Sequence, residues 1–143
     1  MTIADFEKGL AALLAWREER SNGTNGMLGV LFVVRNRQKA GWSAGSWSKI
    51  IEGHNQFSSM SVSGDSQTVA YPDVRDPSFL TILQLVDSIY DETRVDNLTN
   101  GALYYADLGS AGFQKGGWFD REIVQKPDLH PRCAQIGTTT FFK

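Results

Sequence analysis

The sequence predicts an α+β fold that is mostly helical and carries a small β element. Three long segments, 3–20, 25–40 and 77–92, repeat apolar residues at the spacing of helices that bury one face. Two other regions are typical of strands and turns: 55–71 alternates and is rich in Ser and Gly, and 134–143 is rich in Thr and Phe. With 143 residues and no long linker, the chain is expected to form a single domain, 1–143.

The first helix has both a start signal and an end. Thr2 followed by Asp5 has the spacing of a capping-box start, in which two side chains bond the first free N–H groups. The apolar residues that recur at helical spacing are Ile3, Phe6, Leu10, Leu13 and Leu14. The next segment, SNGTNG (21–26), is dense in turn-forming residues and is expected to end the helix near residue 20.

The second helix is expected over 25–40. Its last turn holds Arg35, Arg37 and Lys39, and this basic end complements the helix dipole. A short helix is expected over 46–53.

The remaining segments predict the β element and the loops. The segment 55–71 predicts a small β-hairpin or a loop. The segment 101–107 is short and aromatic, and it suits either a strand or a buried helical turn. The segment 109–120 is rich in glycine and predicts a loop. The last segment, 134–143, predicts a strand.

Charge and composition limit the partners. The chain has 14 basic and 16 acidic residues, so it lacks the positive field that holds nucleic acids, and no nucleic-acid partner is expected. Its apolar runs are far shorter than a membrane span, so we expect no membrane insertion. The N-terminus has neither a basic region nor a long apolar core, which predicts no signal peptide and synthesis in the cytoplasm.

No metal and no cofactor are expected. His54, His130 and Cys133 are too few for a zinc site, which takes three or four ligands. His130 and Cys133 could form a nucleophilic pair, but no surrounding signature supports one. In the glycine-rich 109–117, Lys115 is followed by Gly rather than by the Ser or Thr of a phosphate-binding loop.

Two adjacent glutamates, Glu18 and Glu19, end the first helix. Glu18 lies roughly 100° from the centre of the apolar face and Glu19 roughly 150°, so Glu18 is at the edge of the buried face and Glu19 is expected to point outward. A carboxyl at such an edge is partly desolvated, which raises its pKa and favours the protonated acid. The same residues also suit an ordinary solvated helix end, and periodicity alone does not separate the two interpretations.

Aromatic and amide side chains gather around two predicted loops. Tyr104, Tyr105, Trp118 and Phe119 flank the glycine-rich segment, and Gln56–Ser58 lie in the predicted hairpin. Aromatic residues are most often part of the core. Flat rings beside amides and hydroxyls are also what a sugar-binding groove uses, since rings cover pyranose faces and polar groups bind hydroxyls.

Several of these segments together resemble one known family. The segments are EERSN (18–22), NR (36–37), QFS (56–58), GALYY (101–105), WFDRE (118–122) and IGTTTF (136–141). In this order and spacing they resemble the spore-cortex-lytic type of bacterial cell wall hydrolase, a lysozyme-like family, over about residues 10–142. Register against the NR pair aligns the family's catalytic glutamate with Glu18 and its arginine with Arg20. The chain departs from the family at three positions: Glu19 replaces a small residue, Ser21 a glycine and Asn22 a second glutamate.

The resemblance implies a fold, an activity and a site. It implies a lysozyme-like fold in which a small β-hairpin lobe flanks the active-site groove. It implies an enzyme that cleaves peptidoglycan glycan strands between N-acetylmuramic acid and N-acetylglucosamine, with Glu18 as the catalytic acid. The residues expected to bind substrate or to position the glutamate are Gln56, Ser58, Tyr104, Tyr105 and Trp118.

Several mechanisms stay open. Hydrolysis by a muramidase needs a second carboxylate, for which Asp65, Asp73 and Asp76 are candidates. Without one, the lytic transglycosylase route is favoured, in which the sugar itself traps the cation and Glu18 acts as acid and then as base. A non-catalytic module that binds glycan or protein is the alternative from another class, and a metal- or thiol-dependent amidase is the weakest alternative.

The sequence is compatible with more than one route by which the protein reaches the bacterial cell wall. A wall-degrading enzyme without a signal peptide suits a phage endolysin that a holin releases, or an effector that a secretion machine injects into a rival cell. It also suits a protein whose leader has been removed. The effector route implies a cognate inhibitor or immunity protein as a further partner.

Overall fold

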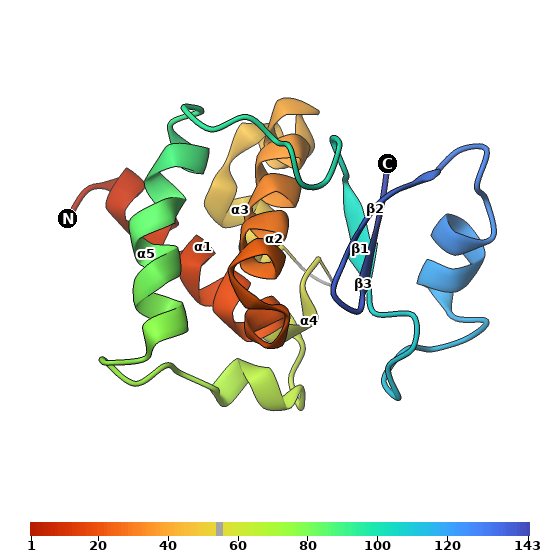
Figure 1. The fold of residues 1–143 in the computed structure, drawn as a ribbon, viewed down its shortest axis with the longest axis horizontal. Helices are drawn as coiled ribbons and strands as arrows, with labels where there is room; N and C mark the ends of the chain where they lie inside the picture. Colours follow the sequence, from red (N-terminus) through yellow and green to blue (C-terminus); the bar gives the residue numbers. More distant parts are fainter. Residues whose placement is uncertain (54–55) are drawn as a thin grey trace.

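The computed structural model describes residues 1–53 and 56–143 and confirms an α+β architecture (Figure 1). Its elements in chain order are α1 (Ile3–Glu19), η1 (Arg20–Asn22), α2 (Gly23–Lys39), η2 (Trp42–Gly45), α3 (Trp47–Glu52), α4 (Ser58–Ser61), η3 (Ser66–Val69), α5 (Pro77–Tyr90), β1 (Tyr104–Ala106), η4 (Asp120–Val124), β2 (Arg132–Ile136) and β3 (Thr139–Phe142). None of the helices in this described part combines the length and the apolar character that crossing a membrane requires.

Helix α1 begins where the sequence predicts. The Thr2 hydroxyl accepts a hydrogen bond from the Asp5 N–H at 3.1 Å, and the Asp5 carboxylate accepts one from the Thr2 N–H at 2.8 Å. This reciprocal pair is the predicted capping box. The helix ends at Glu19, and a single 3-10 turn leads to Gly23, whose positive φ of 72° starts α2 in a direction that other residues rarely allow.

Helix α2 is the centre of the molecule. Its middle, from Gly26 to Arg35, is buried on all sides, with α1, α3 and α5 packed around it. Figure 1 shows α2 between the other helices and the sheet. Gly29 makes the approach to the sheet possible, because a Cβ there would lie 2.8 Å from Cζ of Phe141 on β3.

The sheet has three antiparallel strands in the order β1-β3-β2. Tyr105 pairs with Phe141 across β1 and β3, and β3 is buried along its whole length. Phe141 packs against Val33 of α2, which joins the sheet to the helical core. The sheet therefore packs along the middle of α2, and its strand β3 also reaches Glu19 at the end of α1.

The expectation of a β-hairpin within 55–71 is wrong. Asn55 lies outside the described residues, and the rest forms the helical turns α4 and η3. The buried Arg17 side chain explains this, because it donates hydrogen bonds to the carbonyls of Ser59 (3.0 Å), Thr68 (3.1 Å) and Ala70 (2.9 Å). These carbonyls are turned inward to one guanidinium and are not free for a strand ladder.

The β structure comes instead from the C-terminal segments. The segment 101–107 contributes β1, and the last segment forms part of a pair, β2 and β3, that turns at Gly137 with a positive φ of 55°. The predicted loop over 109–120 is correct up to Gly117, after which a helical turn begins at Trp118. The helices expected over 3–20, 25–40, 46–53 and 77–92 are all confirmed, with ends within about two residues.

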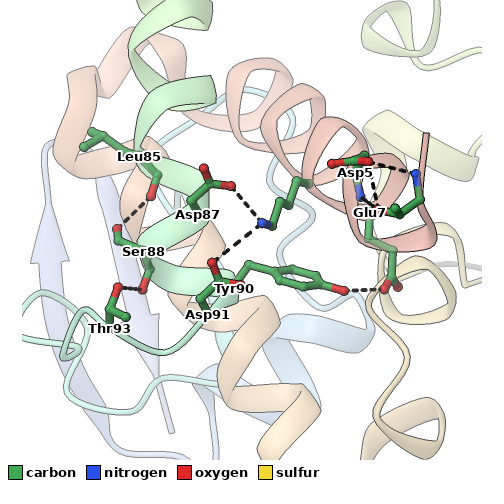
Figure 2. A network of polar contacts seen from close by, with 10 residues as sticks. Asp5, Glu7, Leu85, Asp87, Ser88, Tyr90, Asp91 and Thr93 are labelled. Atoms are coloured by element: carbon green, nitrogen blue, oxygen red, sulfur yellow. Dashed lines mark hydrogen bonds and ion pairs between the residues drawn. The ribbon is translucent and has the colours of Figure 1, made fainter.

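A buried carboxylate far from the sheet ties three helices together. Glu7 on α1 is 7% exposed, accepts a 2.6 Å hydrogen bond from the Ser48 N–H at the start of α3, and accepts a 2.8 Å bond from the Tyr90 hydroxyl on α5. Figure 2 shows the Glu7–Tyr90 contact beside the ion pair of Lys8 with Asp87. Burial and the Glu7 carboxylate raise the pKa of Tyr90 to about 12.

We expect Glu7→Ala to lower the free energy of unfolding by about 2–4 kcal/mol, because it leaves two partly buried donors without an acceptor. Tyr90→Phe removes one donor together with its need for a partner, so its cost should be smaller, about 1 kcal/mol. Urea unfolding of the three proteins measures both. Equal losses for the two variants would contradict the role given to Glu7.

Candidate active site

A cleft of about 840 Å³ opens between the end of α1 and the sheet. All six residues that the sequence predicts for the site line this cleft: Glu18, Gln56, Ser58, Tyr104, Tyr105 and Trp118. They come from α1, from the turn before α4 and its first residue, from β1 and from the segment before η4. The fold thus brings together side chains that are up to 100 positions apart in the chain.

Glu18 is the partly buried carboxyl at the end of α1. Desolvation by the surrounding protein raises its pKa from the ordinary value of 4.5 to about 7, and the nearby charges of Glu19 and Asp65 act in the same direction. The enclosed hydroxyls of Ser59 and Tyr105 face this carboxyl and oppose the rise, since they favour its charged form. The upward shift agrees with the prediction, and Glu18 can hold or release a proton near neutral pH.

Ser59 is a site residue that the sequence interpretation missed. Ser58 is predicted, and it does line the cleft, but the hydroxyl that lowers the pKa of Glu18 belongs to Ser59. In a hairpin, alternate residues would face the groove, whereas α4 is helical and turns by about 100° per residue. The position was therefore missed because the secondary structure was predicted wrongly.

Tyr105 is held rigidly against Glu18. Its ring lies between Phe57, at a centroid distance of 6.2 Å, and Phe141, at 5.8 Å. Its hydroxyl is enclosed and has no hydrogen-bond partner among the described residues. Burial, together with the Glu18 charge, raises the pKa of Tyr105 well above its usual range, so the phenol stays protonated and can only share its proton.

No ion pair within the described residues involves Glu18. The two arginines beside it in sequence are engaged elsewhere: Arg17 binds backbone carbonyls, and Arg20 stacks on the Trp16 ring at 4.1 Å. Arg20, which the resemblance aligns with a family arginine, also donates to Gln67 at 2.8 Å and does not line the cleft. The carboxyl of Glu18 thus faces the cleft rather than a fixed cation.

The expectation that Glu19 points outward is wrong. Glu19 is only 3% exposed, and its carboxylate accepts hydrogen bonds of 2.6 Å from Asn22 and 2.6 Å from Thr139 on β3. Helical periodicity describes burial by the helical core alone. Here the C-terminal strand covers the opposite side of the helix end, and this burial raises the pKa of Glu19.

Aromatic rings form one wall of the cleft. Trp118 is 61% exposed and lies at the rim of the cleft. The ring of Tyr104 packs edge-to-face against Trp42 and Phe119, with centroid distances of 5.7 Å and 6.5 Å, respectively. Gln56 and Ser58 supply polar groups to the same cleft. Exposed ring faces beside amides and hydroxyls can bind a chain of sugar rings.

The three aspartates considered as second carboxylates do not line the cleft. Asp65, Asp73 and Asp76 cap local turns by accepting backbone N–H bonds from Gln67, Arg75 and Phe79, respectively. Asp107, which the sequence interpretation missed, does line the cleft, and it accepts bonds from the Thr138 hydroxyl at 2.9 Å and the Gly109 N–H at 3.2 Å. Within the described part of the chain, no three or more His, Cys, Asp or Glu residues cluster as a metal site would.

Comparisons with protein-family models, with curated proteins and with solved structures found no match to this chain. The features that bear on function are therefore the geometry of the cleft and the order of the sequence motifs.

The Glu18 titration should make stability depend on pH. Because its pKa in the folded protein, about 7, exceeds the ordinary 4.5, the folded state binds more protons in this window and loses stability as pH rises through it. Glu18→Gln stays neutral at every pH. Relative to the variant, the wild type should lose up to about 3 kcal/mol between pH 4 and pH 8. A difference between the two proteins that does not change with pH, measured by urea unfolding, would contradict this assignment.

Proposed function

We propose that the protein cleaves the glycan strands of peptidoglycan between N-acetylmuramic acid and N-acetylglucosamine, as a lytic transglycosylase with a lysozyme-like fold. One observation carries the proposal: a carboxyl with a pKa of about 7, free of any described ion pair, opens into a cleft lined by aromatic rings. The family motifs in the sequence, which the three comparisons do not corroborate, point to the same residue.

The reaction begins with proton transfer from Glu18 to the glycosidic oxygen. The bond between this oxygen and the anomeric carbon breaks, the leaving sugar departs as an alcohol, and the muramic acid ring carries the positive charge. Its own 6-hydroxyl then attacks the anomeric carbon and gives its proton to the Glu18 carboxylate. The products are a shortened strand and a 1,6-anhydromuramic acid end, and Glu18 is protonated again.

The state of the other carboxylates favours this route over hydrolysis. Among the described residues that line the cleft, Glu19 and Asp107 are the further carboxylates, and both already accept hydrogen bonds from threonine hydroxyls. A hydrolytic muramidase needs a second carboxylate that is free to act as a nucleophile or to activate a water molecule. Because both are held by hydroxyl donors of the sheet segment, we favour the route that needs no second carboxylate.

The remaining site residues would bind the strand. Trp118 and Tyr104 offer ring surfaces to the pyranose faces, and Gln56 and Ser58 offer groups that bond sugar hydroxyls or acetamido groups. Tyr105 is enclosed, so its role is to position Glu18 and to share a proton with its carboxylate. The route to the wall, by holin or by secretion machine, and a cognate inhibitor stay predictions of the sequence.

Digestion of purified sacculi tests the proposal. The wild type should release anhydro-muropeptides, identified by mass spectrometry, and Glu18→Gln should lower the rate by about 10²–10⁴-fold because the general acid is lost. Asp73→Asn is the matched control, since it also replaces a carboxyl with an amide but lies outside the cleft, and it should retain activity. Equal activity in Glu18→Gln would refute the assignment.

Other products would favour the alternatives. Reducing ends would indicate a hydrolytic muramidase, and Asp107 would then be the first carboxylate to test. Binding to sacculi without soluble product would indicate a non-catalytic module. Loss of activity when a chelator is added, or in the Cys133→Ser variant, would indicate a metal- or thiol-dependent amidase.

The pH profile separates positioning by Tyr105 from substrate binding. Its hydroxyl favours the charged form of Glu18, so Tyr105→Phe should raise the pKa of Glu18 and move the alkaline limb of kcat/KM to higher pH. Tyr104→Phe is the matched control, since it changes the cleft wall without touching Glu18 and should leave the limb in place. Identical profiles for the two variants would contradict the positioning role.

A further inference from the structure

Arg37 is a buried cation in the wall of the cleft. It lines the cleft, yet it is only 6% exposed, and its guanidinium lies 4.7 Å from the centroid of the Trp42 ring, 4.8 Å from Phe57 and 5.8 Å from Tyr104. It comes from the last turn of α2, where the sequence predicts a basic helix end and one half of the NR pair, with no role in the site.

Most of its hydrogen-bonding capacity is unused. Nε donates to the Leu103 carbonyl at 2.8 Å, but neither terminal nitrogen donates to any described residue, and Nη1 is completely enclosed. No ion pair within the described residues reaches it either. Aromatic rings stabilise the charge but accept no strong N–H bonds, so the guanidinium lacks the partners that a buried charge requires.

The carboxylates of the cleft do not supply the missing partner. Glu19 and Asp107 are bonded to Thr139 and Thr138, respectively. Glu18 is near enough for its charge to be felt by Arg37, but it is held partly protonated by its burial. The unpaired donors at the cleft wall therefore indicate a ligand.

We propose that Arg37 binds a carboxylate of the glycan substrate and so selects acidic strands over neutral ones, an inference that rests on the proposed function. Nε is bonded to Leu103 and Nη1 is enclosed, so Nη2 is the terminal nitrogen that can donate a charge-assisted hydrogen bond to a carboxylate in the cleft. Peptidoglycan offers this group from two sources: the lactyl ether of muramic acid in peptide-free strands, and the stem peptide where one is attached. Chitin-type oligosaccharides of N-acetylglucosamine carry neither.

Binding to defined tetrasaccharides tests the proposal. In a Glu18→Gln background, which prevents turnover, calorimetry compares four ligands: the peptide-free muramyl tetrasaccharide, its lactyl methyl ester, the peptide-bearing form and chitotetraose. The ester should bind about 10–100-fold more weakly than the free acid, since a charge-assisted pair is lost. Arg37→Met should remove this difference, and Arg37→Lys should retain part of it. If the peptide-bearing ligand loses as much affinity in Arg37→Met as the free acid does, the carboxylate that Arg37 binds in that ligand belongs to the stem peptide.

The results that overturn the proposal are separate from those that overturn the function. Equal affinity for acid and ester, with a peptide-bearing form insensitive to Arg37→Met, would refute the carboxylate contact while sacculus digestion still supports the enzyme. An equal loss for all four ligands in Arg37→Met would show that Arg37 only packs the rings. If Arg37→Met fails to fold, the protein with its native Arg37 still tests the proposal through changes in the ligand. The affinities to compare are those of the ester and the free acid, and those of peptide-bearing strands with and without amidated carboxyl groups. No binding and no digestion at all would refute both.

Discussion

The last turn of α1 organises the site because it sends three consecutive polar side chains in three directions. Arg17 gathers the carbonyls of the segment after α4, and Glu19 receives hydroxyl and amide donors from β3 and η1. Glu18 lies between them in sequence and is left facing the cleft. Side chains on a helix are separated by about 100°, so one turn can anchor two walls and present a third group to the space between them.

The acidity of Glu18 is consequently a property of the walls rather than of the helix. The segment that Arg17 holds brings Ser59 to the carboxyl, and the sheet that Glu19 anchors brings Tyr105. Together they exclude water, which raises the pKa, and they supply hydroxyls that keep the charged form accessible. A break in either anchor would change the protonation of Glu18 without touching its side chain.

Sequence periodicity predicted what depends on local pattern and missed what depends on distant contacts. Helix α1, its capping box and the edge position of Glu18 follow from residues within one turn or two of each other. Glu19 was misjudged because its partner Thr139 lies 120 positions away. The hairpin was mispredicted because Arg17 collects carbonyls of 59–70, an interaction that no pattern within 55–71 contains. The cleft residues were found through the order of motifs, whereas Arg37, although part of the NR pair that sets their register, was not predicted to lie in the cleft wall.

The enclosure of Glu18 also bears on which reaction suits the site. In the reaction proposed for this site, the acid gives up its proton and leaves a carboxylate in a partly desolvated place, where charge is costly. Hydrolysis would require an ordered water, and a base to activate it, to enter beside that charge before the proton could return. In the transglycosylase route the attacking hydroxyl is already attached to the bound sugar, and its proton neutralises Glu18 in the same step. One titrating carboxyl, two enclosed hydroxyls and further carboxylates that accept threonine hydroxyls are the features on which we base the proposal of the second sequence of events.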